Sequence, residues 1–218
     1  MISLSYSKWS AWNKCPRRFK LDHIDQLFRA EPSPAMIRGS DIHSNVEHFL
    51  LGQTDELHPD IREYYGQFLT NLRNAGAIPE QKIAIDPLWK LVDWDGETYC
   101  RSVIDCHLPM REDGVVDAFE WKTGKMYPEH AHQVELYAVK LKVLYPKAKQ
   151  INVTGVYFDL KRNGATYLHP DYYQEMKIEL WDNNFRKILR DEVFEPNPSY
   201  GCKFCPHSSV FNGGSCEF

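Results

Sequence analysis

The period of the hydrophobic pattern changes once along this chain, near residue 76, and that change does most to limit the fold. Before it, apolar residues recur at helical spacing over 37–51 and 59–75, and Gly76 ends the second helix. After it, strand-like segments cover 80–86, 88–94, 98–109 and 115–122, with turn signals at Asp95-Gly96 and Asp113-Gly114. Helices followed by a strand meander predict a sheet with helices packed against it.

The remaining segments are mixed. We expect a helix over 129–145, a strand over 151–160, a hairpin turn at Asn163-Gly164 and a long amphipathic helix over 171–192. Near the start, Ser7 can cap a short helix that runs to Asn13, Pro16 suits the first turn of a second helix, and 30–35 is expected to be a loop. The sequence therefore predicts an α/β (α+β) domain with an N-terminal helical portion.

Length and composition fit one globular domain. The chain has 218 residues, of which 43% are hydrophobic and 26% charged, enough apolar material for a core. We expect a helical part over 1–76, a core over 77–195 and a cysteine-bearing tail over 196–218.

Charge and targeting signals narrow the class of protein. A net charge of −4 argues against a protein that coats nucleic acid non-specifically, but local basic patches and metal ions still permit a nucleic-acid enzyme. No apolar run approaches the length of a membrane span, and the first residues lack the layout of a signal peptide. We expect a cytoplasmic protein with no membrane partner, in which cysteines stay reduced.

The segment 101–125 carries the most chemistry. Asp105 lies late in one expected strand, and Glu120 and Lys122 share a face at the end of the next. An antiparallel pair would bring Asp105 beside Glu120, and two close carboxylates favour a hard divalent ion such as Mg²⁺ or Mn²⁺. Such an ion can activate a water, and a neighbouring lysine can stabilise charge at a phosphoryl group. The alternative is a surface strand with alternating charge, which an isolated E-x-K triplet would favour.

Two helices supply further polar pairs at matching spacing. His43 and Glu47 lie four residues apart on the helix 37–51, and Gln133 and Tyr137 lie four apart on the helix after the Glu120 strand. In order along the chain, the motifs are Gly39 to His43, then Asp105, then Glu120-Trp121-Lys122, then the Q-x-x-x-Y helix.

This order resembles the RecB-like exonuclease branch of the PD-(D/E)XK nuclease superfamily, over about residues 5–216. The resemblance implies a restriction-endonuclease-like core, with a central mixed sheet flanked by helices and an N-terminal helical elaboration. It implies that His43, Asp105, Glu120 and the backbone carbonyl of Trp121 bind the metal and that Lys122 is catalytic. It also implies that Gln133 and Tyr137 contact DNA or brace the metal site. For Glu47, a metal-site role and a solvent-facing one are equally open; Asp117 is expected to face the other side of its strand.

The cysteines suggest a second site. Cys202 and Cys205 form a C-x-x-C pair, Cys216 follows, and Cys15 lies near the start, whereas Cys100 and Cys106 are expected to be buried. The first four resemble the iron–sulfur staple of four-cysteine, CRISPR-type members of this branch, which implies a 4Fe–4S cluster, with Zn²⁺ as the alternative. The last gap is longer than in those relatives, so His207 could replace a cysteine, and unliganded thiols remain an alternative.

Basic and aromatic residues near the start are candidates for holding a DNA strand. Arg17 and Arg18 are candidate phosphate contacts, while Trp9 and Trp12 either stack on bases or, as we favour, anchor the helix in a core.

The resemblance implies a DNA exonuclease that acts on free ends. We expect its substrate to be single-stranded rather than double-stranded. The short chain lacks a helicase motif, which favours a stand-alone enzyme of the kind found in phages or CRISPR loci. A non-catalytic DNA-binding protein with a metal-stapled nuclease fold and a DNA endonuclease are the alternatives.

Overall fold

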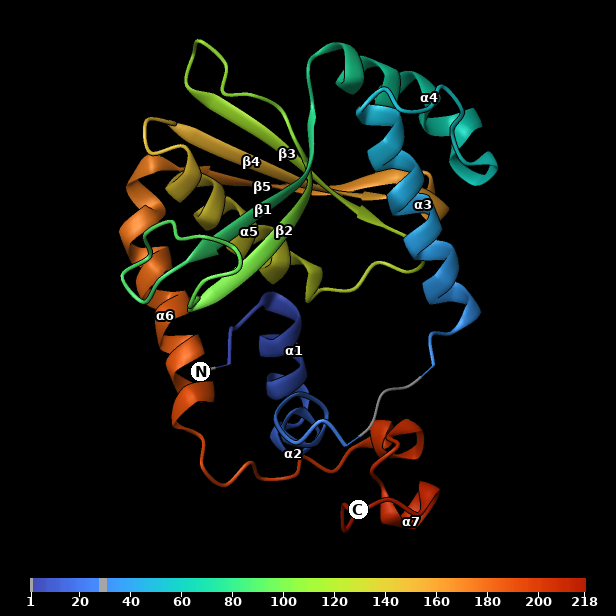
Figure 1. Cartoon of the computed structure of the whole chain (residues 1–218), viewed down its shortest axis with the longest axis vertical. Helices are drawn as coiled ribbons and strands as arrows, with labels where there is room; N and C mark the ends of the chain where they lie inside the picture. The colour runs from blue at the N-terminus through green and yellow to red at the C-terminus, as the bar shows by residue number, and fades with distance from the viewer. Residues whose placement is uncertain (1, 28–30) are drawn as a thin grey trace. The chain divides into compact units, whose positions relative to one another are not determined.

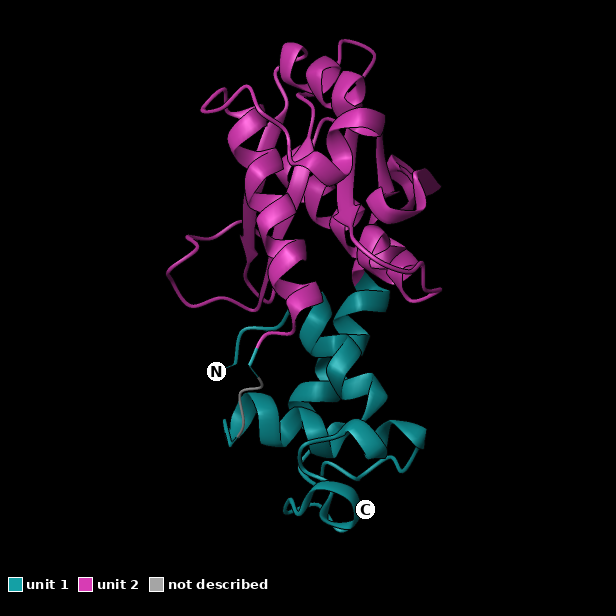
Figure 2. Cartoon of the chain, turned by 90° about the vertical axis from the view of Figure 1, so that its right-hand side faces the viewer, with its two compact units in different colours: residues 1–31, 179–218 teal, residues 32–178 magenta. Residues whose placement is uncertain are grey.

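The computed structural model describes residues 2–27 and 31–218, which divide into two compact units. Unit 1 joins the two ends of the chain, residues 1–31 and 179–218, and unit 2 is the continuous segment 32–178 (Figure 2). The single-domain organisation expected from the sequence stays a prediction.

Unit 2 contains the sheet together with three complete α-helices (Figure 1). Its elements are α3 (Pro34–Leu50), α4 (Pro59–Asn74), β1 (Ile78–Ile85), β2 (Cys100–His107), β3 (Val115–Lys122), α5 (His130–Leu144), β4 (Gln150–Tyr157), the 3₁₀ turn η2 (Phe158–Leu160), β5 (Arg162–Pro170), the 3₁₀ turn η3 (Asp171–Tyr173) and the first part of α6 (Gln174–Arg190).

The five strands form one mixed sheet in the order β1-β2-β3-β4-β5. Three neighbouring pairs are antiparallel, and β3 and β4 are parallel. A parallel pair needs a crossover connection, which α5 provides. The expected α/β class with a mixed sheet and flanking helices is confirmed.

One apolar core of unit 2 lies between α3, α4 and one face of the sheet. Apolar residues of the two helices, among them Ile42 and Leu69, pack with Trp121 of β3 and Val156 of β4. Successive residues of a strand point to opposite faces, so Glu120 faces away from this core, towards α5. Val116 and Ala118, on the same face of β3 as Glu120, are also buried, so this face combines apolar packing with the polar site.

Unit 1 brings helices from both ends of the chain together. It contains α1 (Tyr6–Lys14), α2 (Pro16–Phe19), the π-helical turn η1 (Lys20–Ile24), the end of α6, the 3₁₀ turn η4 (Tyr200–Phe204) and α7 (Ser209–Asn212). Trp9 is nearly buried, with its ring centroid 5.1 Å from that of Trp181 at 69°. The expectation that Trp9 belongs to a core is confirmed.

Three sequence expectations about the elements are wrong. Residues 88–94 form a loop because Pro87 has no N–H to donate and the Asp86 carboxylate accepts from the backbone N–H groups of Leu88 and Lys90, each at 2.9 Å. The first helix is capped by Ser5 rather than Ser7, because the Ser5 hydroxyl accepts from Lys8 N.

The third concerns the last hairpin. Its turn lies at η2 and the left-handed Lys161 (φ 51°), so the strand expected over 151–160 ends at Tyr157 and Asn163-Gly164 belongs to β5. Of the loop expected over 30–35, residue 30 lies outside the described residues, 31–33 are irregular, and Pro34 already begins α3. None of the helices that the structure describes is long and apolar enough to cross a membrane.

Gly164 has a packing role, not a turn role, which gives a stability prediction. A Cβ at this position would lie 2.9 Å from Cε2 of Tyr157, so Gly164→Ala should destabilise the protein by about 1–3 kcal/mol, the usual cost of overpacking. Gly66→Ala is the matched control. Its Cβ would lie 3.8 Å from Leu57 within α4, so it should stabilise by up to about 1 kcal/mol. Urea unfolding measures both, and equal stability of the two variants would contradict this account.

Candidate active site

Two adjacent strands bring Asp105 and Glu120 together. Cys106 pairs with Phe119 and His107 with Ala118, so the same antiparallel register places Asp105 opposite Glu120. The Trp121 N–H donates to Asp105 Oδ2 at 2.7 Å, which fixes the orientation of that carboxylate. Both carboxylates are buried, Glu120 with 3% and Asp105 with 8% of its surface exposed.

The Glu120 carboxylate has one oxygen satisfied and one left over. Lys122 Nζ donates to Glu120 Oε1 at 2.8 Å, and Gln133 Nε2 donates to the same oxygen at 2.6 Å. Glu120 Oε2 is buried and accepts no hydrogen bond from any residue that the structure describes. Burial, and next the charge of Asp105, raise the pKa of Glu120 well above its usual value although Lys122 opposes the shift. A cation beside Glu120 would bind the free Oε2 atom and would also stabilise the charged form of the carboxylate.

Helix α5 holds this arrangement from the other side. Gln133 and Tyr137 lie one turn apart, and Gln133 Nε2 donates to the Tyr137 hydroxyl at 2.9 Å. Lys122 Nζ also donates to Gln133 Oε1 at 2.7 Å, so the lysine is held between Glu120 and the helix. Burial, followed by the charge of Glu120, raises the pKa of Tyr137. The sequence-derived set Asp105, Glu120, Lys122, Gln133 and Tyr137 is thus contiguous.

His43 and a residue missed in the sequence complete the acidic cluster. His43 Nδ1 lies 3.5 Å from Asp105 Oδ1, and Glu80 of β1 joins them so that one ligand atom from each residue lies within 4.8 Å of the others. In residues 2–27 and 31–218, no other group of three His, Cys, Asp or Glu residues meets that limit. Carboxylate oxygens suit both Mg²⁺ and Mn²⁺, and the imidazole nitrogen suits Mn²⁺.

Glu80 sits in an unusual backbone conformation. Its φ is +49°, and its neighbours Pro79 and Gln81 pair with Cys106 and Ile104 on either side of Asp105. Left-handed backbone is costly for a residue with a Cβ and concentrates at functional sites. Burial first, and then the charges of Asp105 and Glu47, raise the pKa of Glu80 to about 7. Although burial lowers the pKa of His43, its bond to Asp105 and the charge of that group raise it overall.

These residues open onto a cavity of about 700 Å³ in unit 2. Its lining includes His43, Glu47, Glu80 and Asp105 together with the loop that follows β3. Glu47 therefore lies at the cluster, where its charge reaches Glu80.

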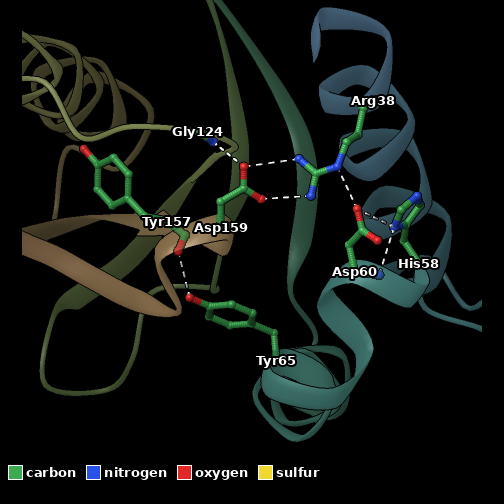
Figure 3. A network of polar contacts seen from close by, with 7 residues as sticks. All are labelled: Arg38, His58, Asp60, Tyr65, Gly124, Tyr157 and Asp159. Atoms are coloured by element: carbon green, nitrogen blue, oxygen red, sulfur yellow. Dashed lines mark hydrogen bonds and ion pairs between the residues drawn. The ribbon is translucent and has the colours of Figure 1, made fainter. Parts of the chain in front are cut away.

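A polar network ties the helix that carries His43 to this loop (Figure 3). Arg38 of α3 donates to Asp159 Oδ1 at 2.9 Å and to Asp60 of α4 at 2.7 Å, and Asp159 Oδ2 accepts from Gly124 N at 2.8 Å. Gly39 permits the close approach, since a Cβ there would lie 3.0 Å from Thr123 Oγ1. The network links α3 to α4, to η2 and to the loop that follows β3.

Asp117 lies outside the cluster. Its carboxylate contacts Arg111 and accepts from Asn152 Nδ2 at 2.7 Å, as expected for the opposite side of β3 from Glu120. The ring of His130, at the start of α5, forms a hydrogen bond with the Tyr157 hydroxyl at 2.9 Å.

Four cysteines gather in unit 1. Cys15, Cys202, Cys205 and Cys216 line one cavity of about 20 Å³, and His207 lies beside it with its Nε2 2.7 Å from Asp22. Backbone N–H groups donate to two of the sulfurs, from Asn197 to Cys15 at 3.5 Å and from Ser199 to Cys202 at 3.4 Å. The sulfurs do not close into a ligand shell by the 4.8 Å limit above. Cys100 and Cys106 are buried, as expected.

The basic residues near the start of the chain are engaged within unit 1. Arg17 donates to the Phe194 carbonyl at 3.0 Å, and Arg18 donates to Asp22 at 3.1 Å. The Trp12 indole N–H donates to Asp191 at 2.7 Å, which gives this half-buried side chain a structural anchor.

Two solved structures were compared with this chain as a whole. One solved structure, of a candidate exonuclease from Eubacterium rectale, has a TM-score of 0.56 and 13% identity over 94% of this chain and 87% of its own. The protein SSO0001 has a TM-score of 0.47 and 16% identity over 95% and 85%. No curated protein sequence matches the chain.

A comparison with protein families covers nearly the whole chain. The sequence model of the PD-(D/E)XK nuclease superfamily matches residues 3–98 and 99–210, which include every member of the acidic cluster. The chain belongs to the PD-(D/E)XK nuclease superfamily.

Proposed function

We propose that this protein is a metal-dependent DNA exonuclease of the RecB-like branch. The observation that carries the proposal is the buried Glu120 carboxylate beside Asp105, with one oxygen unsatisfied and Lys122 bound to the other. Membership of a nuclease superfamily supports phosphodiester hydrolysis, and the structural neighbour described as a candidate exonuclease supports the choice of exonuclease.

The residues of the cluster fit a divalent ion. His43, Glu80 and Asp105 would bind Mg²⁺ or Mn²⁺, and Glu120 with the Trp121 carbonyl would complete the set that the family resemblance implies. When bound, the ion supplies a polarised phosphoryl oxygen and a water of lowered pKa.

The protein's own groups would then position the reactants. The Lys122 ammonium, fixed by Glu120 and Gln133, would orient the attacking water and stabilise negative charge as it develops at the phosphorus. Gln133 and Tyr137 would keep Glu120 and Lys122 in place. Arg17 and Arg18 stay candidate phosphate contacts.

We propose that the four cysteines that line the cavity of unit 1 bind a structural metal centre, either a 4Fe–4S cluster or Zn²⁺. This metal centre, called the staple below, would cross-link the two ends of the chain. The cysteines line one cavity, and N–H bonds to thiolate sulfur are a feature of such sites. Cross-linking Cys15 to the tail closes a loop of nearly the whole chain, which contributes on the order of a few kcal/mol in the loop-entropy picture.

Three further parts of the proposal rest on the sequence alone. They are a preference for single strands with free ends, a cytoplasmic location and a phage-type origin.

The first test is digestion of DNA. With Mg²⁺ or Mn²⁺, the protein should degrade end-labelled linear DNA and leave a closed circle intact, and EDTA should stop the reaction. A cut circle would identify an endonuclease, and no cleavage of any DNA would favour a non-catalytic binding protein.

The catalytic assignments are tested in the same assay. Asp105→Ala, Glu120→Ala and Lys122→Ala should each lower kcat by at least about 10²–10³-fold, because the two carboxylates would hold the ion and the lysine would stabilise the developing charge. Asp117→Asn is the matched control, since this carboxylate lies on the other side of β3 and should leave the rate unchanged. A folded Glu120→Ala variant with full activity would refute the site.

His43 and Glu80 should govern metal affinity. His43→Ala and Glu80→Gln should each raise the Mn²⁺ concentration for half-maximal activity by about 10–100-fold. Because both groups must lose a proton to bind metal and their pKa values are raised, Glu80 to about 7, affinity should increase with pH and level off above 7. Glu80→Gln should flatten this rise. Unchanged metal titrations in both variants would show that these residues are structural.

The staple predicts bound metal in unit 1. Freshly purified protein should contain iron or zinc, and Cys202→Ala should lose it and unfold at a lower denaturant concentration. Cys100→Ala, a buried cysteine outside the cavity, should keep the metal. Active protein with neither iron nor zinc would rule out the staple.

A further inference from the structure

A second cavity of unit 2 lies beside the catalytic strands. It measures about 370 Å³, within the usual range of about 300–1,000 Å³ for small-molecule sites, and its wall is mainly apolar and aromatic. Tyr127, His130 and Tyr157 provide the rings, and Arg162 lies on its wall. None of these residues belongs to the acidic cluster.

The rings of this cavity are held in a fixed arrangement. His130 and Tyr157 stack with centroids 5.7 Å apart at 21°, and their Nδ1 and hydroxyl groups are 2.9 Å apart. Tyr127 meets His130 edge to face at 5.5 Å and is 49% exposed. Gly155 and Gly164 make room, since a Cβ on either would lie within 3.2 Å of the Tyr157 ring. The arrangement presents aromatic surface to solvent beside a rigid stack.

Arg162 brings positive charge without a matching carboxylate. Among residues 2–27 and 31–218 it forms no ion pair, and its guanidinium donates to Met126 Sδ at 3.9 Å. Arg38, at the first cavity, is by contrast bound to two carboxylates. A guanidinium without a carboxylate partner, beside aromatic rings, suits a nucleotide. The guanidinium can bind the phosphate, and the rings can stack on the base.

The residues that line this cavity are neighbours, in the sheet and in the sequence, of residues in the candidate active site. Tyr157 of β4 pairs with Lys122 of β3, and His130 lies three residues before Gln133 on α5. The loop between β3 and α5 borders both cavities, the first with Thr123 and Gly124 and the second with Met126, Tyr127 and Pro128. A strand with its scissile phosphate at Lys122 would therefore pass this cavity with a neighbouring nucleotide.

We propose that this cavity binds one unpaired nucleobase of the substrate strand, stacked on Tyr127 beside the His130–Tyr157 pair, with Arg162 on a phosphate of that strand. The proposal rests on the proposed DNA cleavage and adds how the strand is held. Stacking accepts any base, so the site would favour unpaired strands without reading their sequence.

The test measures base stacking without hydrolysis. In the Lys122→Ala background, 2-aminopurine replaces single bases along a single-stranded oligonucleotide, and its fluorescence is followed as protein is added. Quenching should be confined to one or two adjacent positions. Tyr127→Ala should abolish it and raise the Kd by about 5–150-fold, the effect of about 1–3 kcal/mol per stacked base. Tyr127→Trp should restore both.

Two further variants make the result specific. Tyr172→Ala removes an aromatic ring that is 79% exposed and lies outside the cavity, and it should change neither signal. Arg162→Ala should reduce the slope of log Kd against log salt concentration by about 0.7, as expected for one phosphate contact on a single strand.

A kinetic cycle separates stacking from a merely structural effect. With otherwise wild-type enzyme, an abasic nucleotide at the quenched position should raise KM more than it lowers kcat, and it should have no additional effect in Tyr127→Ala. Equal quenching at all positions, an unchanged Kd in Tyr127→Ala, or independent effects of the two changes would overturn the proposal. Failure of the proposed function would appear differently, as absence of metal-dependent cleavage by the unmodified protein.

Discussion

The Glu120 carboxylate, buried beside Asp105, is the constraint on which the rest of the structure depends. Removing a charged group from water is expensive unless opposite charge and hydrogen bonds compensate. Lys122 and Gln133 both donate hydrogen bonds to Oε1, whereas none of the residues that the structure describes donates one to Oε2. The sheet register and Gln133 of the Q-x-x-x-Y helix hold this group beside Asp105, and His43 in turn lies 3.5 Å from Asp105. A fold that only needed stability would place an apolar residue there.

Much of this arrangement could be predicted because it depends on local rules. The turn at Asp113-Gly114, with Gly114 at φ +84°, sets an antiparallel pair, and period-two alternation then places Asp105 opposite Glu120 and separates both from Asp117. Helical spacing likewise puts Gln133 and Tyr137 on one face. Each of these inferences uses residues close in sequence or joined by one tight turn.

The parts that escaped prediction depend on tertiary contacts or irregular backbone. Glu80 belongs to the cluster through a left-handed residue in β1, where alternation no longer tells which face a side chain takes. Gly164 suggested a turn, but its lack of a Cβ accommodates the Tyr157 ring. Asp86 closes a loop with its side chain where the apolar pattern suggested a strand. The cysteines share a cavity, but the distances between their sulfurs, on which any metal binding depends, are not fixed by sequence spacing.

The most direct measurement of the central claim is Mn²⁺ binding by calorimetry, compared with cleavage of a labelled DNA strand by the same preparations over the same Mn²⁺ concentrations. The account predicts that binding and cleavage saturate together, and that Asp105→Asn loses both while its fold stays intact. Cleavage that proceeds without bound metal, or Mn²⁺ binding that is unaffected by Asp105→Asn, would contradict it.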